Sequence, residues 1–323
     1  MSRIDFVGLA RQAAGRGDAE SLMEYYVPVE TTNVTANRET LEIEETTGTR
    51  FPIGIDYGTR YYELPLVGAP RVASLPRVLS AFLGQPASSG SAPYTHTFDP
   101  TLAGKIAEWH SLIVARMDPN PPIVDHFTDA RGNELSLNIA PNDYLRFEAT
   151  FYALHCDEIA APVPTTDMTQ RKKFAEAHVS ISEDGGTTWL AEQISAAWGI
   201  TYNNNLDTDE AILGSYELYA LPEGNADLEV RFSPRENMET FYRRNLLQDP
   251  DDLAIKMVAT GAGGEEISVI AHSVEITDAP APVSGADVLK MIEVTGRAKI
   301  GTTGAAAGKF VTIAVKNSVA TYT

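Results

Sequence analysis

The chain has 323 residues, of which 43% are hydrophobic, and it carries a formal net charge of −19 at pH 7. The acidity is spread over the chain, because residues 1–165 hold 12 Lys+Arg against 21 Asp+Glu and residues 166–323 hold 13 against 23. Tight phosphate binding would need a basic patch, and basic residues cluster only at 171–173 and 243–244, where a solvated linker or helix face is the more common role. No apolar run approaches the roughly 18 residues of a membrane span, and a single cysteine, Cys156, excludes an internal disulfide framework.

The first strong pattern is a long hairpin. Residues 40–45 alternate, with Leu41 and Ile43 on one face and Glu42 and Glu44 on the other. A glycine-containing connection over residues 47–59 leads to a partner strand at residues 61–66. We expect one face of this hairpin to cover a core and the other to carry bare negative charge.

A short helix is predicted next, over residues 75–83. Ser74 is a suitable N-cap, Pro76 lies in the first turn, and Gly84 ends the segment. Beyond it, alternating strands are predicted at residues 134–139 and 144–151, joined by an Ala-Pro-Asn-Asp turn.

Two prolines among small residues, Pro162 and Pro164, predict a break in the middle of the chain. Further strands and one helix are expected after it: strands at 177–182, 194–203, 214–221, 226–232, 253–260 and 267–277, and a helix at 234–247. A second proline-rich stretch at 279–285 precedes two closing strands at 288–300 and 310–320. Each half thus has the order strands, helix, strands, without residue-level similarity.

Together these segments resemble the tail tube proteins of long-tailed, non-contractile bacteriophages. The resemblance rests on the hairpin, the helix ending in Leu-Gly at residues 83–84, the return strand at 93–100, the polar turn at 203–206 and the closing strand from Val311. It implies a mainly β fold of two tandem tail-tube-type β-sandwich domains, each with a short helix. The domains would span residues 1–160, with an N-terminal arm and the hairpin loop, and 172–323, separated by a linker at 161–171.

The same resemblance implies the function and the partners. Chains would form rings that stack into a conduit for double-stranded DNA, with no enzyme activity, no cofactor and no membrane contact. Two tube domains per chain imply trimeric rings with pseudo-sixfold symmetry. The tape measure, tail terminator and tail tip proteins would be further partners. With no hydrophobic secretory segment at the start, we expect assembly in the host cytoplasm and a final location in the virion.

Two sets of functional residues follow. Four glutamates on alternating strands are candidates for the lumen: Glu42, Glu44, Glu217 and Glu229. Residues of the hairpin connection are candidates for contact with the adjacent ring, because a long polar connection is usually functional: Gly48, Thr49, Arg50, Asp56, Tyr57 and Gly58.

Chemical sites have weak support in the sequence. The six histidines show no metal-ligand spacing, and the glycine-rich segment 301–309 has the wrong spacing for a phosphate-binding loop. The alternative function is a β-rich binding module, for carbohydrate or as an accessory virion protein. In that case Trp109, Trp189 or Trp198 would be exposed to stack on a ligand.

Overall fold

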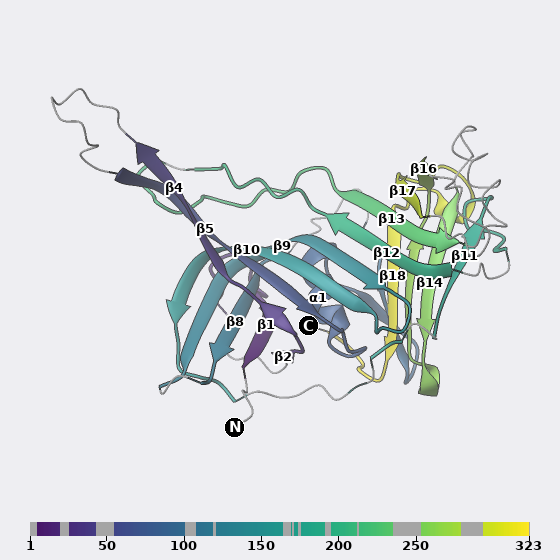
Figure 1. Ribbon diagram of the computed structural model, residues 1–323, viewed down its shortest axis with the longest axis horizontal. Coiled ribbons are helices and arrows are strands. Elements are labelled where there is room, and N and C mark those ends of the chain that lie inside the picture. Colours follow the sequence, from purple (N-terminus) through teal and green to yellow (C-terminus); the bar gives the residue numbers. More distant parts are fainter. Residues whose placement is uncertain are drawn as a thin grey trace, which may run out of the picture.

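The computed structural model describes residues 5–19, 26–42, 55–100, 108–118, 121–163, 169, 171–173, 176–190, 195–211, 213–234, 253–278 and 293–322. Over these residues the protein is mainly β, as predicted, with its strands in two sheets (Figure 1). The described part of the chain has one α-helix, α1 (Leu75–Leu83), and two short 3-10 turns, η3 (Ala262–Gly264) and η4 (Gly304–Ala306).

The larger sheet contains a continuous run of antiparallel strands. Its order is β16 (Val274–Asp278), β17 (Val294–Ala298), β13 (Asp227–Pro234), β12 (Ser195–Asn203), β9 (Ile123–Ile139), β10 (Arg146–Glu158) and β5 (Ile55–Gly68). Beyond β5, the outer side is paired by β3 (Thr31–Thr32) and then by β4 (Thr35–Glu42).

Strand β9 joins two branches of the sheet, because it is long enough to pair with two different strands on the same side. Residues Glu134–Ile139 pair with β12, whereas Ile123–Ala130 pair with β8 (His110–Arg116). Strand β8 continues this branch to β1 (Phe6–Arg11) and β2 (Tyr26–Val27). The sheet therefore forks between Ala130 and Glu134.

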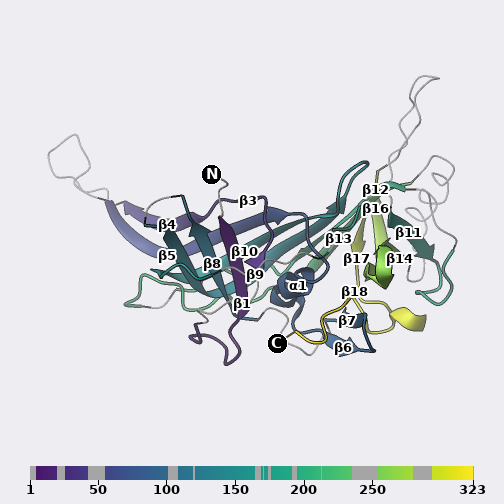
Figure 2. The same ribbon diagram turned by 90° about the horizontal axis from the view of Figure 1, so that it is seen from below.

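The second sheet has the order β11 (Ala177–Ser182), β14 (Ala254–Thr260), β15 (Glu266–Ala271), β18 (Val311–Asn317), β7 (Tyr94–Phe98) and β6 (Ala87–Ser89). Helix α1 lies against the larger sheet, between β1 and the β6–β7 end of the second sheet (Figure 2). Leu75, Val78, Leu79 and Phe82 give α1 its apolar face, and all are buried. Gly84 ends the helix with φ 76°.

One apolar core connects both sheets. It joins Leu64, Phe147 and Phe151 of the larger sheet with residues of the second sheet such as Met257 and Val269. The rings of Phe82 and Phe151 meet edge to face with centroids 5.2 Å apart. Burial of aromatic and branched side chains is the main favourable term in such a fold.

The structure differs from the sequence prediction at several elements. Strand β5 begins at Ile55, so the last part of the predicted connection 47–59 is strand. Residues 214–221 form no strand and only bridge their neighbours at Glu217 and Leu218. Ser74 donates its hydroxyl to the carbonyl of Arg71 instead of capping α1. The predicted second helix at 234–247 lies outside the described residues, apart from its first position.

The predicted boundary at 161–171 does not separate the sheets. Strands β12 and β13 join the larger sheet beside β9, while β7 joins the second sheet beside β18. Each sheet thus takes strands from both halves of the chain. The division into two tandem domains stays a prediction.

Candidate assembly surfaces

The face of the larger sheet that points away from α1 is polar. Core side chains such as Leu135, Leu137, Phe147 and Phe151 alternate with residues on this opposite face. The run β5, β10, β9, β13, β17, β16 places both signs of charge there, with these residues among them: Glu63, Glu134, Glu148, Asp227, Glu229, Glu275, Asp278, Arg131, Arg146, Arg231 and Arg297. Among these residues the carboxylates outnumber the guanidinium groups, seven to four. We refer to this surface as the polar face.

The basic residues of the polar face all lie beside carboxylates. Arg146 contacts Glu30, and its Nε donates to Oδ2 of Asp143 at 2.8 Å. Arg231 contacts Glu229, and Arg297 stands in register between Glu229 and Glu275. Because each cation is compensated locally, the face as a whole presents excess negative charge.

The hairpin formed by β4 and β5 extends beyond the body of the sheet (Figure 1). Leu41 and Tyr57 on it are 48% and 49% exposed. The prediction that Leu41 covers a core of its own chain is therefore wrong: at this distance from the body, no second layer lies within the described residues. The guanidinium of Arg38 stacks 3.8 Å from the ring centroid of Tyr57 and stiffens the hairpin.

The connection between β12 and β13, residues 204–226, folds back over the first half of the chain. Its residues Leu206, Leu218 and Leu221 form a small buried cluster with Leu154 of β10, against which Trp109 also packs. Hydrogen bonds to backbone carbonyls fix the start and the middle of this connection. The amide of Arg60 on β5 donates to the carbonyl of Tyr216 at 2.8 Å, and the side chain of Asn204 donates to the carbonyl of Gly132 at 2.8 Å.

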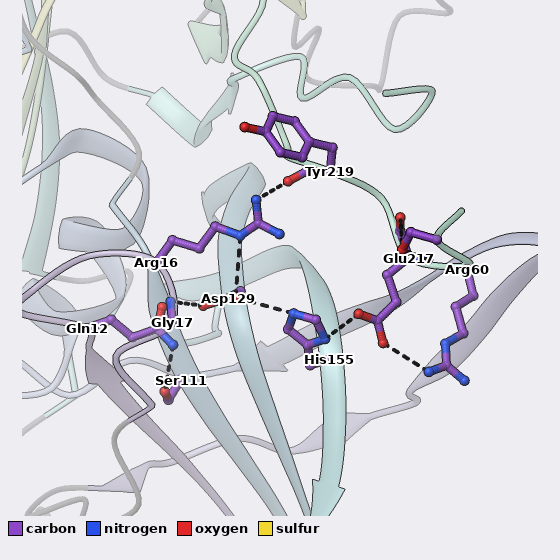
Figure 3. A network of polar contacts seen from close by, with 10 residues as sticks. Gln12, Arg16, Gly17, Arg60, Ser111, Asp129, His155, Glu217 and Tyr219 are labelled. Carbon is purple, nitrogen blue, oxygen red and sulfur yellow. Dashed lines mark hydrogen bonds and ion pairs between the residues drawn. The ribbon is translucent and has the colours of Figure 1, made fainter. Parts of the chain in front are cut away.

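A series of ion pairs holds this connection against β5, β10 and β9 (Figure 3). Glu217 accepts a hydrogen bond from Arg60 at 3.0 Å and lies 3.0 Å from Nδ1 of His155. The other ring nitrogen of His155 lies 3.4 Å from Asp129, which also pairs with Arg16. Burial would raise the pKa of Glu217, but Arg60 and His155 outweigh it and hold that pKa below its usual value.

The two ends of the strand run have open sides in the described structure. Strand β16 pairs only with β17, and β4 pairs only with β5. Unpaired strand edges present rows of free backbone donors and acceptors and readily pair with another chain. These two edges are therefore candidates for contact between subunits.

The predicted lumen residues fall in different environments. Glu229 lies on the polar face, whereas Glu217 lies in the ion-pair chain of the 204–226 connection. Glu42 ends β4, where only the backbone is described, and Glu44 lies outside the described residues. The other glutamates of the polar face, Glu63, Glu134, Glu148 and Glu275, were not selected from sequence. Their alternation with Leu64, Leu135, Phe147 and Ile276 was the available signal.

The predicted inter-ring residues divide similarly. Asp56 and Tyr57 are exposed on β5, and Gly58 faces Glu39, where a Cβ would lie 2.9 Å from Oε2 of Glu39. Gly48, Thr49 and Arg50 lie outside the described residues.

Two of the three tryptophans of the binding-module alternative, Trp109 and Trp189, are partly exposed. Trp198 is buried in the core, and Trp109 carries the guanidinium of Arg131 4.3 Å from its ring centroid.

Burial raises the pKa of the Cys156 thiol to about 11, so this thiol stays protonated. Within the described residues, no three His, Cys, Asp or Glu side chains gather as a metal site. No described helix is both long and apolar enough to cross a membrane.

The described part of the chain is thus a β-rich protein with two unpaired sheet edges, an acidic sheet face and a projecting hairpin (Figure 1). The family model of phage tail tube proteins matches residues 6–298. The chain therefore belongs to the phage tail tube family, whose members are structural virion proteins that assemble into a tube and are not enzymes. No curated protein matches the sequence.

Proposed function

We propose that this protein forms the stacked rings of a phage tail tube, and that the larger sheet supplies its inner wall. The observation that carries the proposal is a repeated strand order. From its β4 edge, the run reads β4, β5, β10, β9 and then β12, β13, β17, β16. Within each group of four, the strands can be numbered by their order in the chain. Across the sheet, both groups then read first, second, fourth, third.

This repeat supports two tube units per chain, one from each half. The unit built on β5 is followed by helix α1, and the sequence predicts a helix at 234–247 directly after β13, the counterpart of β5. Three chains would then supply six quasi-equivalent units to a ring. Within the chain, β9 pairs antiparallel with β12, so β16 of one chain would pair in the same manner with β4 of the next.

The polar face would line the lumen in this arrangement, with Glu229 and the carboxylates found beside it, and with Glu42 and Glu44 at the hairpin. Its excess negative charge repels DNA phosphates over about 8 Å at physiological salt, which prevents adhesion during passage. The mechanism is electrostatic and steric. The tape measure, tail terminator and tail tip proteins are the proposed further contacts, and the host cytoplasm is the proposed place of assembly.

The far end of the hairpin, including Gly48, Thr49 and Arg50, is the proposed contact with the adjacent ring. A connection of this length has a function in most compact proteins. Deleting Gly48–Arg50 should leave rings that no longer stack into tubes. Normal tubes from this deletion would assign the hairpin end another role.

Electron microscopy and native mass spectrometry of the purified protein test the proposal directly. The expected particles are rings or hollow tubes, and the expected ring contains three chains. Rings of six chains would contradict the proposal of two tube units per chain, but they would still agree with a tube. Dispersed monomers at all concentrations would overturn the tube function.

A further inference from the structure

The repeated strand order also relates two connections that differ in appearance. Residues 204–226 join β12 to β13, and the hairpin end joins β4 to β5, which hold the same places in their groups. In the second group this connection lies across the neighbouring group of the same chain. It contacts β9 at Gly132, β10 at His155 and β5 at Arg60.

Within the described residues, β4 of the first group pairs with β5 and with no strand on its other side. There the hairpin projects (Figure 1). Leu41 and Tyr57 on it are about half exposed. Their counterparts on the 204–226 connection, Leu206, Leu218 and Leu221, are buried on Leu154 of β10. The exposed apolar side chains of the hairpin thus lack the surface that the second group already has.

We infer that the hairpin of one chain lies laterally across the second group of the next chain in the same ring, as residues 204–226 lie across the first group within the chain. This inference rests on the proposed tube function. The repeat maps β9, β10 and β5 onto β16, β17 and β13. The acceptor surface is therefore the end of these strands marked by Val274, Arg297 and Asp227.

The acceptor surface has the composition for this contact. Ile300, two residues past β17, is 38% exposed and supplies an apolar site for Leu41 and Tyr57. Within the described residues Arg297 makes one ion pair, a long contact of 3.9 Å to Asp227, and it stands in register between Glu229 and Glu275. Asp56 on the hairpin would add a further acidic partner. Within one chain the 204–226 connection is held by a contact of the same kind, the pair of Arg60 on β5 and Glu217 at 3.0 Å, although β5 corresponds to β13 and not to β17.

Charge substitutions at both sides of the contact test the inference. Leu41→Glu and, separately, Ile300→Glu should each raise the concentration for half-assembly of rings about tenfold or more, because central apolar contacts carry most of an interface's energy. Leu190→Glu is the matched control, since Leu190 is 43% exposed next to β11. Circular dichroism establishes that each variant is folded. Ring assembly unchanged in both folded variants would overturn the inference.

Cross-linking then distinguishes a lateral contact from one between rings. In a Cys156→Ser background, Tyr57→Cys with Ile300→Cys should give covalent dimers and trimers in isolated rings treated with a short bis-maleimide. Links that form only in stacked tubes, or no links in rings, would overturn the lateral contact. If the wild-type protein forms no rings, that result contradicts the proposed tube function itself, and it is thereby distinguished from a failure of the lateral contact.

Discussion

The side-chain amide of Asn204 donates a hydrogen bond to the backbone carbonyl of Gly132, 2.8 Å away, at the fork of the larger sheet. Along β9, the pairing with β8 ends at Ala130, and the pairing with β12 begins only at Glu134. The carbonyl of Gly132 therefore has no strand partner on that side. Asn204, 1% exposed, replaces the missing ladder bond and starts the 204–226 connection.

Asn204→Ala should destabilise the protein by about 1–3 kcal/mol, because it leaves a buried carbonyl without its donor. Urea unfolding followed by circular dichroism measures the change. Asn203→Ala, which removes an exposed contact to Glu134, is the control and should cost clearly less. Equal losses in the two variants would show that the fork does not depend on this hydrogen bond.

Gly132→Ala should also destabilise the fold, by about 1–3 kcal/mol, through overpacking. An added Cβ would lie 2.6 Å from the ring of Phe82, which is fully buried. Because the clash is with that ring, Phe82→Leu combined with Gly132→Ala should cost less than the sum of the single changes. Additive losses in this double-mutant cycle would place the strain elsewhere.

Stability should fall as the pH drops from about 6.5 to about 4. Burial lowers the pKa of His110 to about 4, so between these values the unfolded chain binds a proton that the folded chain does not. The loss at the low end is about 3 kcal/mol. His272, whose pKa is also lowered by burial, acts in the same direction.

Unfolding free energies of His110→Gln, measured across this pH range, check the assignment. The variant should have a flatter profile than the wild type below pH 6.5, because the titrating group is gone. A profile as steep as that of the wild type would assign the acid sensitivity to other groups.

Glu217→Gln should loosen the 204–226 connection without unfolding the protein. The change weakens the pairs with Arg60 and His155, which are partly exposed and worth less than about 1 kcal/mol each. Hydrogen exchange should therefore quicken over residues 213–221 and at the amide of Arg60, while β9 and β10 keep their protection. Unchanged exchange would mean that the apolar cluster around Leu154 holds the connection alone.

Charge reversal tests the proposed lumen. Replacing Glu42 and Glu44 together by lysine, or Glu134 and Glu148 together, should permit ring assembly and slow DNA ejection, because lysines bind phosphates. The control exchanges Glu183, next to β11, and Glu266 on β15, which belong to the second sheet. Particles with either lumen pair changed that eject at the normal rate would show that those side chains do not line the path.

Local pattern was sufficient for much of the fold. The helix at 75–83 was predicted at its observed bounds, because its apolar spacing, Pro76 and Gly84 act over one or two turns. Strands β4, β5, β7 and β9 to β18 overlap predicted segments, since period-two alternation persists wherever one face is buried. The family resemblance, built on the order of these elements, agrees with the family match.

Only the tertiary structure decided which strands are neighbours and what each charged residue faces. Alternation places Glu229 on a polar face, but it does not show that Arg231 and Arg297 lie beside it. The alternation of residues 40–45 also assigned Leu41 to a core, although β4 extends past the second sheet and Leu41 is exposed. The pattern of residues 214–221 predicted a strand, whereas Glu217 in this segment pairs with Arg60 and His155. Sequence alone determined the periodicity of each segment. The pairing of segments far apart in the chain depends on packing and long-range contacts, which no local pattern encodes.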